Sequence, residues 1–336
     1  MNRYLFIALF VHVMMTGANG LFAQDNPTHL FRGYWDNDFF NIRGRGTDEA
    51  YTNGFRFDLF HLQKPKAKKF IIDRFLFPKA GDSSVNVRGW GFGQMMMTPR
   101  DLNKTDYQPG DYPYAGALVG IHSLYSYNPK KKYSLQTELM AGVRGPEAFA
   151  AQTQTFIHKL IGNSPPRGWN NQLGTKMILN ANFTVEKQLT HYRNVGEMIV
   201  GGQAFAGTLF NFASAYATFR IGKMTPYFNG YLSQHSSIGS STSQRRNRLQ
   251  AYLIIRPSAG FTINNDMLTK ETHTPTDAHG SVQSSPPIEH WNLSIDYGAV
   301  ITSGHVGFSF IQKSMSAMLK GLPRHEVGNV SLYYTW

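Results

Sequence analysis

Apolar and polar residues alternate one by one in several long segments of the chain. The clearest segment spans residues 292–301, where the apolar set is Leu293, Ile295, Tyr297, Ala299 and Ile301. The same period of two recurs over 133–143 and 329–336. Such alternation predicts β-strands, either in a barrel whose outer face meets lipid or in a soluble sandwich. The pattern alone leaves both folds open.

About twelve strands are predicted, an even number, as closed antiparallel barrels prefer. They cover approximately 28–40, 50–62, 88–98, 114–127, 133–144, 168–189, 196–209, 211–222, 249–264, 289–301, 305–316 and 326–336. The last strand ends in the aromatic Trp336, which resembles the signal that the barrel-assembly machinery recognises. We therefore expect an all-β fold, a closed antiparallel transmembrane β-barrel of about twelve strands. Segments 63–88 and 223–248 are long for periplasmic turns and leave room for an extra strand or helix.

Residues 145–173 depart from this pattern and predict a helix in an extracellular loop. Pro146 suits a first helical turn, Glu147 complements the N-terminal dipole, and Gly162 suits a C-terminal cap. A helical wheel groups an apolar stripe that is expected to be the packed face, formed by Phe149, Phe156, Ile157, Leu160 and Ile161. The other side carries Glu147, Gln154 and His158, with Ala151 beside them. That side suits an imidazole held over a substrate cleft, although a lone histidine is more often a surface or internally bonded residue.

Composition narrows the location of the protein. A basic start, an apolar run from Tyr4 to Met15 and small residues up to Ala23 predict a signal peptide over 1–23 and a barrel domain over 24–336. The apolar run is too short for a membrane anchor. The chain has no cysteine and is 14% aromatic, a composition common in outer-membrane barrels and unusual in small secreted scaffolds.

The net charge of +12 indicates which kinds of partner the protein is suited to bind. Nucleic acid is not expected, because the chain is exported and contains no recognisable nucleic-acid module. An anionic membrane surface or a phosphorylated glycolipid suits the charge better. Basic loops that serve only solubility are the alternative.

Unusual polar residues collect at one end of the predicted barrel. If both termini are periplasmic, odd-numbered strands run outward, and the outer ends carry Asp36-Asn37-Asp38, Tyr51-Thr52-Asn53-Gly54, Thr98-Pro99-Arg100, Pro113-Tyr114-Ala115-Gly116, Gly145-Pro146 and Gly168-Trp169. The His158 helix belongs to the same rim. A bare porin has no reason to cluster acids, amides and hydroxyls there.

These motifs, in this order, resemble the lipid A 3′-O-deacylases of the outer membrane. Further matching elements are Gly93-Gln94, Gln154-x-x-x-His158 and Gly168-Trp169-x-x-Gln172-Leu173, so that the ordered motifs run from about residue 34 to 190. The resemblance implies a twelve-stranded barrel and a carboxylic ester hydrolase that uses calcium. Its substrate is lipopolysaccharide, from which it removes the acyloxyacyl chain at the 3′ position of lipid A. The site is then expected at the outer-leaflet side, between the barrel wall and a helix from an extracellular loop.

The resemblance also implies roles for single residues. His158 matches the general base that activates water, a task that suits its ordinary pKa. Asn37 matches a positioning or transition-state group, Thr52 the hydroxyl of the second strand, and Gln154 the amide before the histidine. Asp38 is assigned to calcium, which prefers oxygen ligands, and the metal would stabilise the oxyanion. Arg100 and Lys104 are candidates for lipid A phosphate or sugar, and solvated loop residues are the alternative.

The chain departs from the family pattern at one point. The family often has an acid near the glycine that matches Gly162, whereas this chain continues with Asn163-Ser164. With less negative charge, calcium affinity is expected to fall. Two other functions stay open: an outer-membrane esterase acting on phospholipid or another acylated glycolipid, and a non-enzymatic channel or adhesin.

Overall fold

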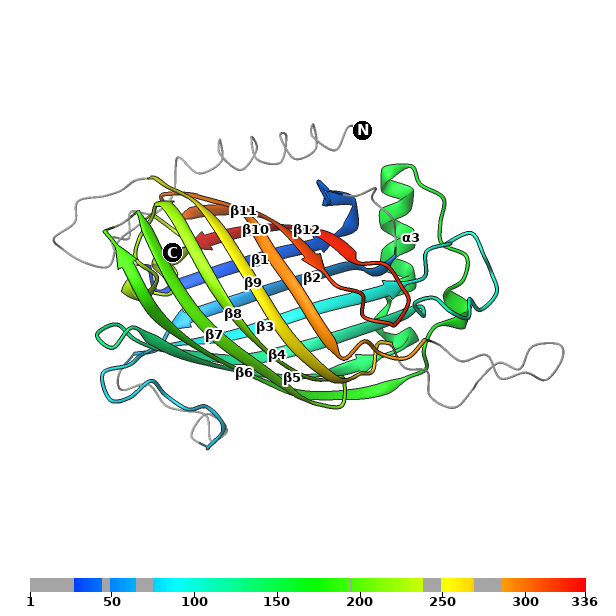
Figure 1. The fold of residues 1–336 in the computed structure, drawn as a ribbon, viewed down its shortest axis with the longest axis horizontal. Helices are drawn as coiled ribbons and strands as arrows, with labels where there is room; N and C mark the ends of the chain where they lie inside the picture. Colours follow the sequence, from blue (N-terminus) through cyan, green and yellow to red (C-terminus); the bar gives the residue numbers. More distant parts are fainter. Residues whose placement is uncertain (1–26, 44–48, 65–74, 194, 238–248, 269–285) are drawn as a thin grey trace.

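The structure is a computed structural model that describes residues 27–43, 49–64, 75–193, 195–237, 249–268 and 286–336. The predicted signal peptide, 1–23, lies outside the described residues. Twelve strands form one closed antiparallel barrel in which β1 pairs with both β2 and β12 (Figure 1). The strands are β1 (His29–Asn37), β2 (Ala50–Leu62), β3 (Val85–Thr98), β4 (Ala115–Asn128), β5 (Tyr133–Arg144), β6 (Lys176–Tyr192), β7 (Gly196–Gly207), β8 (Phe210–Lys223), β9 (Leu249–Asn265), β10 (Trp291–Ser303), β11 (Val306–Met315) and β12 (His325–Thr335).

The expected fold class is confirmed, and two of the strand boundaries that differ from the prediction have local reasons. β1 ends at Asn37, since the Asn37 Oδ1 atom accepts a hydrogen bond from the Phe39 amide at 2.8 Å and caps a 3-10 turn over Asp38–Phe40. The predicted strand 168–189 begins only at Lys176, because a 3-10 turn, Trp169–Asn171, precedes it.

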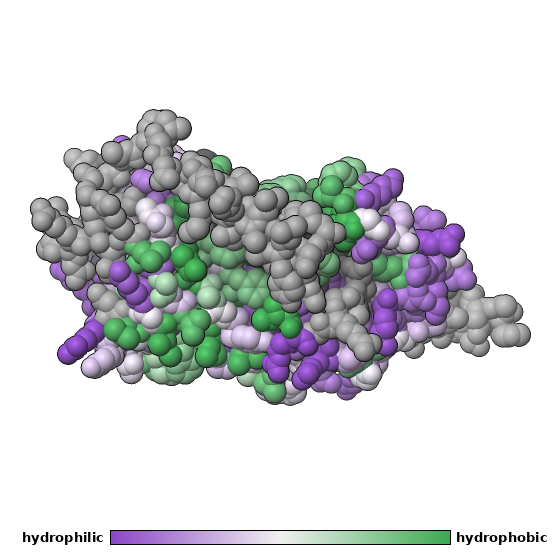
Figure 2. All heavy atoms as spheres, turned by 90° about the horizontal axis from the view of Figure 1, so that it is seen from above, coloured by the Kyte–Doolittle hydropathy of each residue, from purple (hydrophilic) through white to green (hydrophobic). Residues whose placement is uncertain are grey.

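The outer surface of the barrel is apolar, as the alternation predicts. Leu179 and Leu293 on this surface are exposed, while Glu138, Asn182 and Asn329 on the inner surface are buried. Figure 2 shows hydrophobic residues along the flank and hydrophilic ones mostly toward the two ends. No helix in the described part of the chain is long and apolar enough to cross a membrane.

Buried ion pairs fill part of the lumen, among them Arg56–Glu138, Arg144–Asp266 and Arg220–Glu197. A polar cavity of about 470 Å³ remains, lined by Arg56, Glu138 and Arg220 and also by Arg32, Tyr34, Tyr125, Arg256 and Lys313. Because Arg56, Arg144 and Arg220 each bond to a carboxylate, the burial of their charge is compensated.

The segment 224–237, after β8, closes the end of the lumen at which β1 begins. It forms two 3-10 turns, Tyr227–Asn229 and Leu232–Gln234, and Phe228 within it is fully buried. Phe228 belongs to an apolar cluster with Leu30, Phe60, Tyr125, Tyr231 and Ile199. The described part of 223–248 thus contains turns rather than an extra strand, while residues 65–74 and 238–248 lie outside the described residues.

The predicted helix is present as α3 (Ala150–Ile161), preceded by a 3-10 turn over Pro146–Ala148. Gly162 caps it with a φ of 78°, in the left-handed region that glycine adopts without strain. In Figure 1, α3 stands across the end of the barrel where β1 and β3 end.

Candidate active site

Helix α3 packs against the outside of the barrel wall, on β3 and β4. A Cβ atom added to Gly116 of β4 would lie 2.4 Å from the Cβ atom of Ala150, so only glycine permits this approach. The Gln94 Nε2 atom of β3 donates a hydrogen bond to the Ala148 carbonyl oxygen at 2.5 Å. These two contacts hold the start of the helix on the lipid-facing surface rather than over the lumen.

The orientation of α3 reverses one expectation. Ala150, Gln154 and His158 are the buried residues of the helix, so its small and polar side faces the protein. Phe156 and Leu160, which were expected to pack, are 67% and 72% exposed. The prediction of a packed apolar stripe is therefore wrong. The small side of the helix fits the barrel wall closely, because Ala150 packs against Gly116 and Met96 where a larger side chain would clash.

His158 is fixed by the turn that follows its own helix. Its ring Nδ1 atom lies 2.7 Å from the carbonyl oxygen of Ser164, and the His158 side chain is buried. A carbonyl oxygen only accepts, so Nδ1 carries the proton and the neutral ring keeps its lone pair on Nε2. The Gly162 cap makes this return of the chain possible. The imidazole is thus oriented as a base that accepts a proton at Nε2.

Gln154 lies one helical turn before His158 and is held by Trp169. The indole Nε1 atom donates to Gln154 Oε1 at 2.8 Å, and the indole ring packs on Tyr114 with ring centroids 4.9 Å apart. Among the described residues, the buried Gln154 Nε2 atom has no hydrogen-bond partner. An oriented, unsatisfied amide donor beside a histidine is suited to bind a carbonyl or carboxyl oxygen.

Asn37 and Asn53 form an amide pair on the outer face of β1 and β2. The Asn37 Nδ2 atom donates to Asn53 Oδ1 at 2.9 Å, and Trp35 Nε1 donates to the same oxygen at 2.5 Å. The Asn53 Nδ2 atom is buried, with no hydrogen-bond partner in the described residues. Arg32 and Tyr34 line the lumen, so the alternation along β1 places Trp35 and Asn37 outside.

Thr52 reaches the same outer face because of a β-bulge. The register between β2 and β3 shifts between Tyr51 and Asn53, leaving Thr52 as the extra residue. The Thr52 Oγ1 atom lies 2.5 Å from Thr98 Oγ1, while the Tyr51 hydroxyl points the other way and bonds to Asp36. The bulge therefore presents the neighbours Thr52 and Asn53 together on the outside of the wall.

Gln94 and Thr98 of β3 complete this polar wall, together with Asn53. Trp90 and Phe92 are exposed on the same face of β3, which the alternation continues through Gln94, Met96 and Thr98. The buried Gln94 Oε1 atom has no hydrogen-bond partner in the described structure. Asn53, Gln94 and Thr98 were not singled out from the sequence as site residues. The sequence could have indicated them, since all three belong to the motifs noted at the ends of the predicted strands.

The helix and the polar wall lie on the same outer face of the barrel. Helix α3 contacts β3 and β4, and Asn37, Thr52 and Asn53 lie on the outer face of the neighbouring β1 and β2. The approach of His158 to Asn37 and Thr52 stays a prediction.

Arg100 and Lys104 lie apart from this buried group, in the loop after β3. Arg100 donates to Glu49 at 2.7 Å, and this hydrogen bond raises the pKa of its guanidinium. Lys104 lies 3.9 Å from Asp101 and is largely exposed, as is Arg100. Both side chains stand at the aqueous border, and neither is part of the covered polar wall.

Asp38 is the carboxylate that was predicted to bind calcium. It is buried in the 3-10 turn that follows β1. Calcium takes six to eight oxygen ligands, usually with more than one carboxylate. Within the described ranges no group of three or more His, Asp or Glu side chains is placed to hold a metal. Further ligands at Asp38 would therefore be amide, carbonyl or water oxygens, and calcium binding there stays a prediction.

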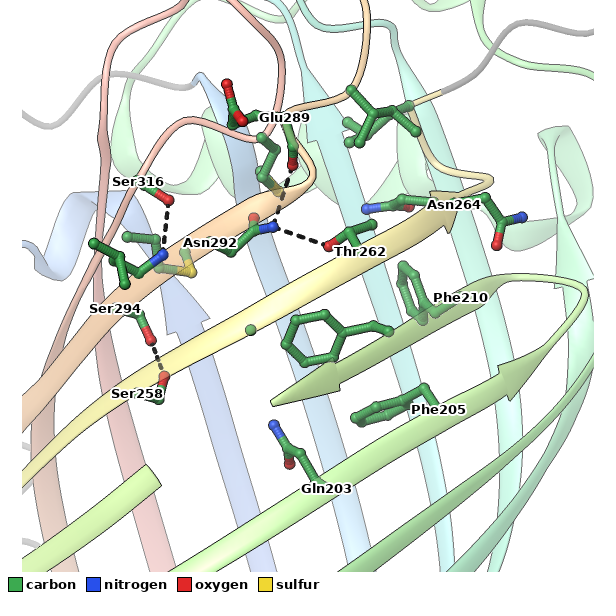
Figure 3. Close-up of a pocket in the computed structure, with 18 residues that line it drawn as sticks. Gln203, Phe205, Phe210, Ser258, Thr262, Asn264, Glu289, Asn292, Ser294 and Ser316 are labelled. Carbon is green, nitrogen blue, oxygen red and sulfur yellow. Dashed lines mark hydrogen bonds between the residues drawn. The ribbon is translucent and has the colours of Figure 1, made fainter. Parts of the chain in front are cut away.

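A separate pocket of about 320 Å³ lies inside the barrel, against β7–β11 (Figure 3). Its polar side chains bond to one another: Asn292 donates to Thr262 and to the Glu289 carbonyl oxygen, and Ser258 contacts Ser294 at 2.6 Å. None of the predicted site residues lines it. The candidate site is therefore the covered outer wall.

Comparisons with known proteins agree with this architecture. The family model of the outer membrane protein LpxR matches residues 5–336. The solved structure of LpxR from Salmonella typhimurium superposes with a TM-score of 0.70 at 16% identity, covering 91% of this chain and 100% of that one. The β domain of the Bordetella autotransporter BrkA gives a TM-score of 0.44 at 8% identity, covering 93% and 100%. No curated protein sequence matches the chain. The family match over nearly the whole chain shows that this protein belongs to the LpxR family and is a β-barrel of the outer membrane.

Proposed function

We propose that the protein is an outer-membrane hydrolase that removes the 3′-linked acyloxyacyl chain from lipid A. Membership of the LpxR family supports an enzyme of this class. The position of the polar wall supports a lipid substrate, because the wall lies on the outside of β1–β4, where acyl chains meet the barrel, and not in the lumen.

One observation carries the proposal: the hydrogen bond between His158 Nδ1 and the Ser164 carbonyl oxygen at 2.7 Å. It fixes the tautomer in which Nε2 is the base. A water molecule gives a proton to Nε2 as its oxygen attacks the ester carbonyl carbon. The tetrahedral intermediate then breaks the bond to the sugar 3′-oxygen, which takes the proton back from the imidazolium. The products are the free acid and the sugar 3′-hydroxyl.

Neutral donors are available for the negative charge of the intermediate. Gln154 Nε2 is oriented by Trp169, and Asn37 Nδ2 has a second hydrogen beyond the one given to Asn53. Thr52 supplies a hydroxyl from the bulge. Donors held in place before the reaction stabilise a developing oxyanion without reorganisation. Calcium dependence stays a prediction, since a single carboxylate, Asp38, supports it, and no step above depends on a metal.

The test is mass spectrometry of lipid A from cells that express the wild type, His158→Ala or His290→Ala. His290 is a matched control, because its Nδ1 atom also contacts a carbonyl oxygen at 2.7 Å, that of Thr262, but outside the α3 site. We expect loss of one 3′ acyloxyacyl group with the wild type and His290→Ala only. Unchanged lipid A in all strains would reject this substrate, and released fatty acid from phospholipid would then identify the esterase alternative.

Repeating the wild-type measurement with a chelator separates the metal from the reaction. Abolished deacylation, restored by calcium, would support a role for Asp38 as a ligand. Deacylation unaffected by the chelator would remove calcium and leave the histidine mechanism. The channel alternative is disfavoured by the lumen, which Phe228 and the segment around it close at one end.

A further inference from the structure

The outward face of α3 is apolar and has no protein partner among the described residues. Phe156 and Leu160 share this face and are 67% and 72% exposed, and Phe149, directly before the helix, is 56% exposed. Burying one such side chain stabilises a folded protein by about 1.5–3 kcal/mol. Three of them left in water would forgo that stabilisation. A soluble protein avoids a patch of this kind unless a partner covers it.

The helix cannot turn this face inward. Its first turn is held by the close contact of Ala150 with Gly116 and by the bond from Gln94 to the Ala148 carbonyl oxygen. Its opposite side holds Gln154 on Trp169. The apolar face must therefore stay on the outside in any state that keeps the site intact.

The face continues the lipid-facing surface of the barrel. On β3, Trp90 and Phe92 are exposed on the outer wall, and Gln94, the next residue on that face, already touches the segment that leads into α3. On β6, Met177 and Leu179 are exposed at the same end of the barrel. The apolar surface of the membrane-spanning strands therefore runs directly into α3.

The polar residues of α3 are placed to one side of the apolar face. On a helical wheel, Gln152 and Lys159 lie beside Phe156, and both are exposed. A helix with an apolar face and a polar edge lies in a membrane interface, with its apolar side chains among the acyl chains and its cation near the headgroups.

We propose that α3 is an interfacial helix of the outer leaflet. Phe149, Phe156 and Leu160 lie among lipid acyl chains, and Lys159 meets the headgroup phosphates. The edge of α3 then borders the acyl layer, from which a lipid reaches His158 sideways without leaving the membrane. This inference rests on the outer-membrane location and not on the proposed deacylation.

The absence of cysteine makes a direct test possible. Phe156→Cys and Leu160→Cys, each made in the full chain, carry one nitroxide label after reconstitution into phosphatidylethanolamine–phosphatidylglycerol vesicles. Collisions with oxygen, which concentrates in the acyl layer, are compared with collisions with a water-soluble nickel chelate. Leu293→Cys on β10 is the lipid reference, and Asn170→Cys, exposed in the loop after α3, is the water reference.

We expect the oxygen-to-nickel ratio at positions 156 and 160 to match Leu293→Cys and to exceed Asn170→Cys several-fold, with Lys159→Cys in between. A ratio equal to that of Asn170→Cys would place the face in water and overturn the proposal. Low collision rates with both reagents would also overturn it, because a second copy of the chain or another segment would then cover the face. Heat-modifiable migration on gels checks that each variant is folded, whether or not it hydrolyses lipid A.

Discussion

The lumen of the barrel and the outer wall beneath α3 are both polar, but they satisfy their polar groups differently. In the lumen, charged groups meet opposite charges, as Arg220 meets Glu197. On the outer wall the groups are mostly neutral amides and hydroxyls, and buried atoms of Asn53, Gln94 and Gln154 have no hydrogen-bond partner in the described structure. Buried atoms without a partner also occur in the lumen, at Arg220 and Tyr125, so it is the grouping of neutral donors and acceptors on the wall that α3 covers that indicates a place for a ligand.

The largest expected effect is on activity, at His158. His158→Ala removes the proposed base and should lower the deacylation rate about 10²–10⁴-fold. It should leave the barrel resistant to heat and detergent, because the wall beneath α3 does not need the imidazole to close. Loss of assembly in this variant would show that His158 is structural and would remove the contrast between the two regions.

A variant in the lumen should change the free energy of unfolding by a comparable amount, rather than the reaction rate. Arg220→Met leaves the buried Glu197 carboxylate without its ion pair, which should cost about 3–5 kcal/mol of unfolding free energy. Denaturant unfolding of the barrel in detergent measures it. The double variant Arg220→Met, Glu197→Met should recover most of this loss. An unstable double variant would mean that Arg220 acts through packing on Tyr252, 4.3 Å from its ring centroid, and not through charge.

A variant at Gln154 should lower activity and leave stability nearly unchanged. Gln154→Met removes the unsatisfied Nε2 donor and the bond from Trp169, so these changes offset each other and stability should move by less than about 1 kcal/mol. The rate should fall by about 10²–10³-fold if Nε2 binds the oxyanion. Gln152→Met, on the exposed side of the same helix, is the matched control and should keep full activity. Equal rates in the two variants would exclude Gln154 from the reaction.

The smallest effect is expected at Arg100. Its guanidinium is largely exposed although its partner Glu49 is mostly buried, so solvent screens the pair, which should contribute about 1 kcal/mol or less. Arg100→Ala should therefore barely change stability. If Arg100 contacts a lipid A phosphate, the variant should need more substrate for half-maximal rate, and added salt should shrink the difference from the wild type. A difference that does not respond to salt would argue against a phosphate contact.

The strands were predictable because the membrane requires one face of each strand to be apolar. Leu293 and Ile295 must be apolar and Ser294 polar wherever lipid and lumen lie on opposite sides, so alternation locates the strands closely. The end of α3 was equally predictable, since Gly162 is the residue that takes a left-handed cap without strain.

Two features of the site were beyond the sequence pattern. A wheel shows that Phe156 and Leu160 share a face but not which medium lies beyond it, and here the polar face is the one that packs. The bulge at Thr52 reverses the alternation within β2, so that period-two counting assigns Thr52 to the lumen, although it contacts Thr98 on the outer wall. A bulge arises from pairing between strands, which a single strand's sequence does not record.

The location of the polar wall outside the barrel also sets the kind of kinetics to expect. A lumenal site is supplied from bulk water and saturates with molar concentration. A site that opens sideways is supplied by lateral diffusion in two dimensions, and its rate follows the mole fraction of substrate in the surface. Diluting lipid A with inert lipid at constant bulk concentration should therefore slow this protein, as surface dilution slows enzymes that never release their substrate from the interface.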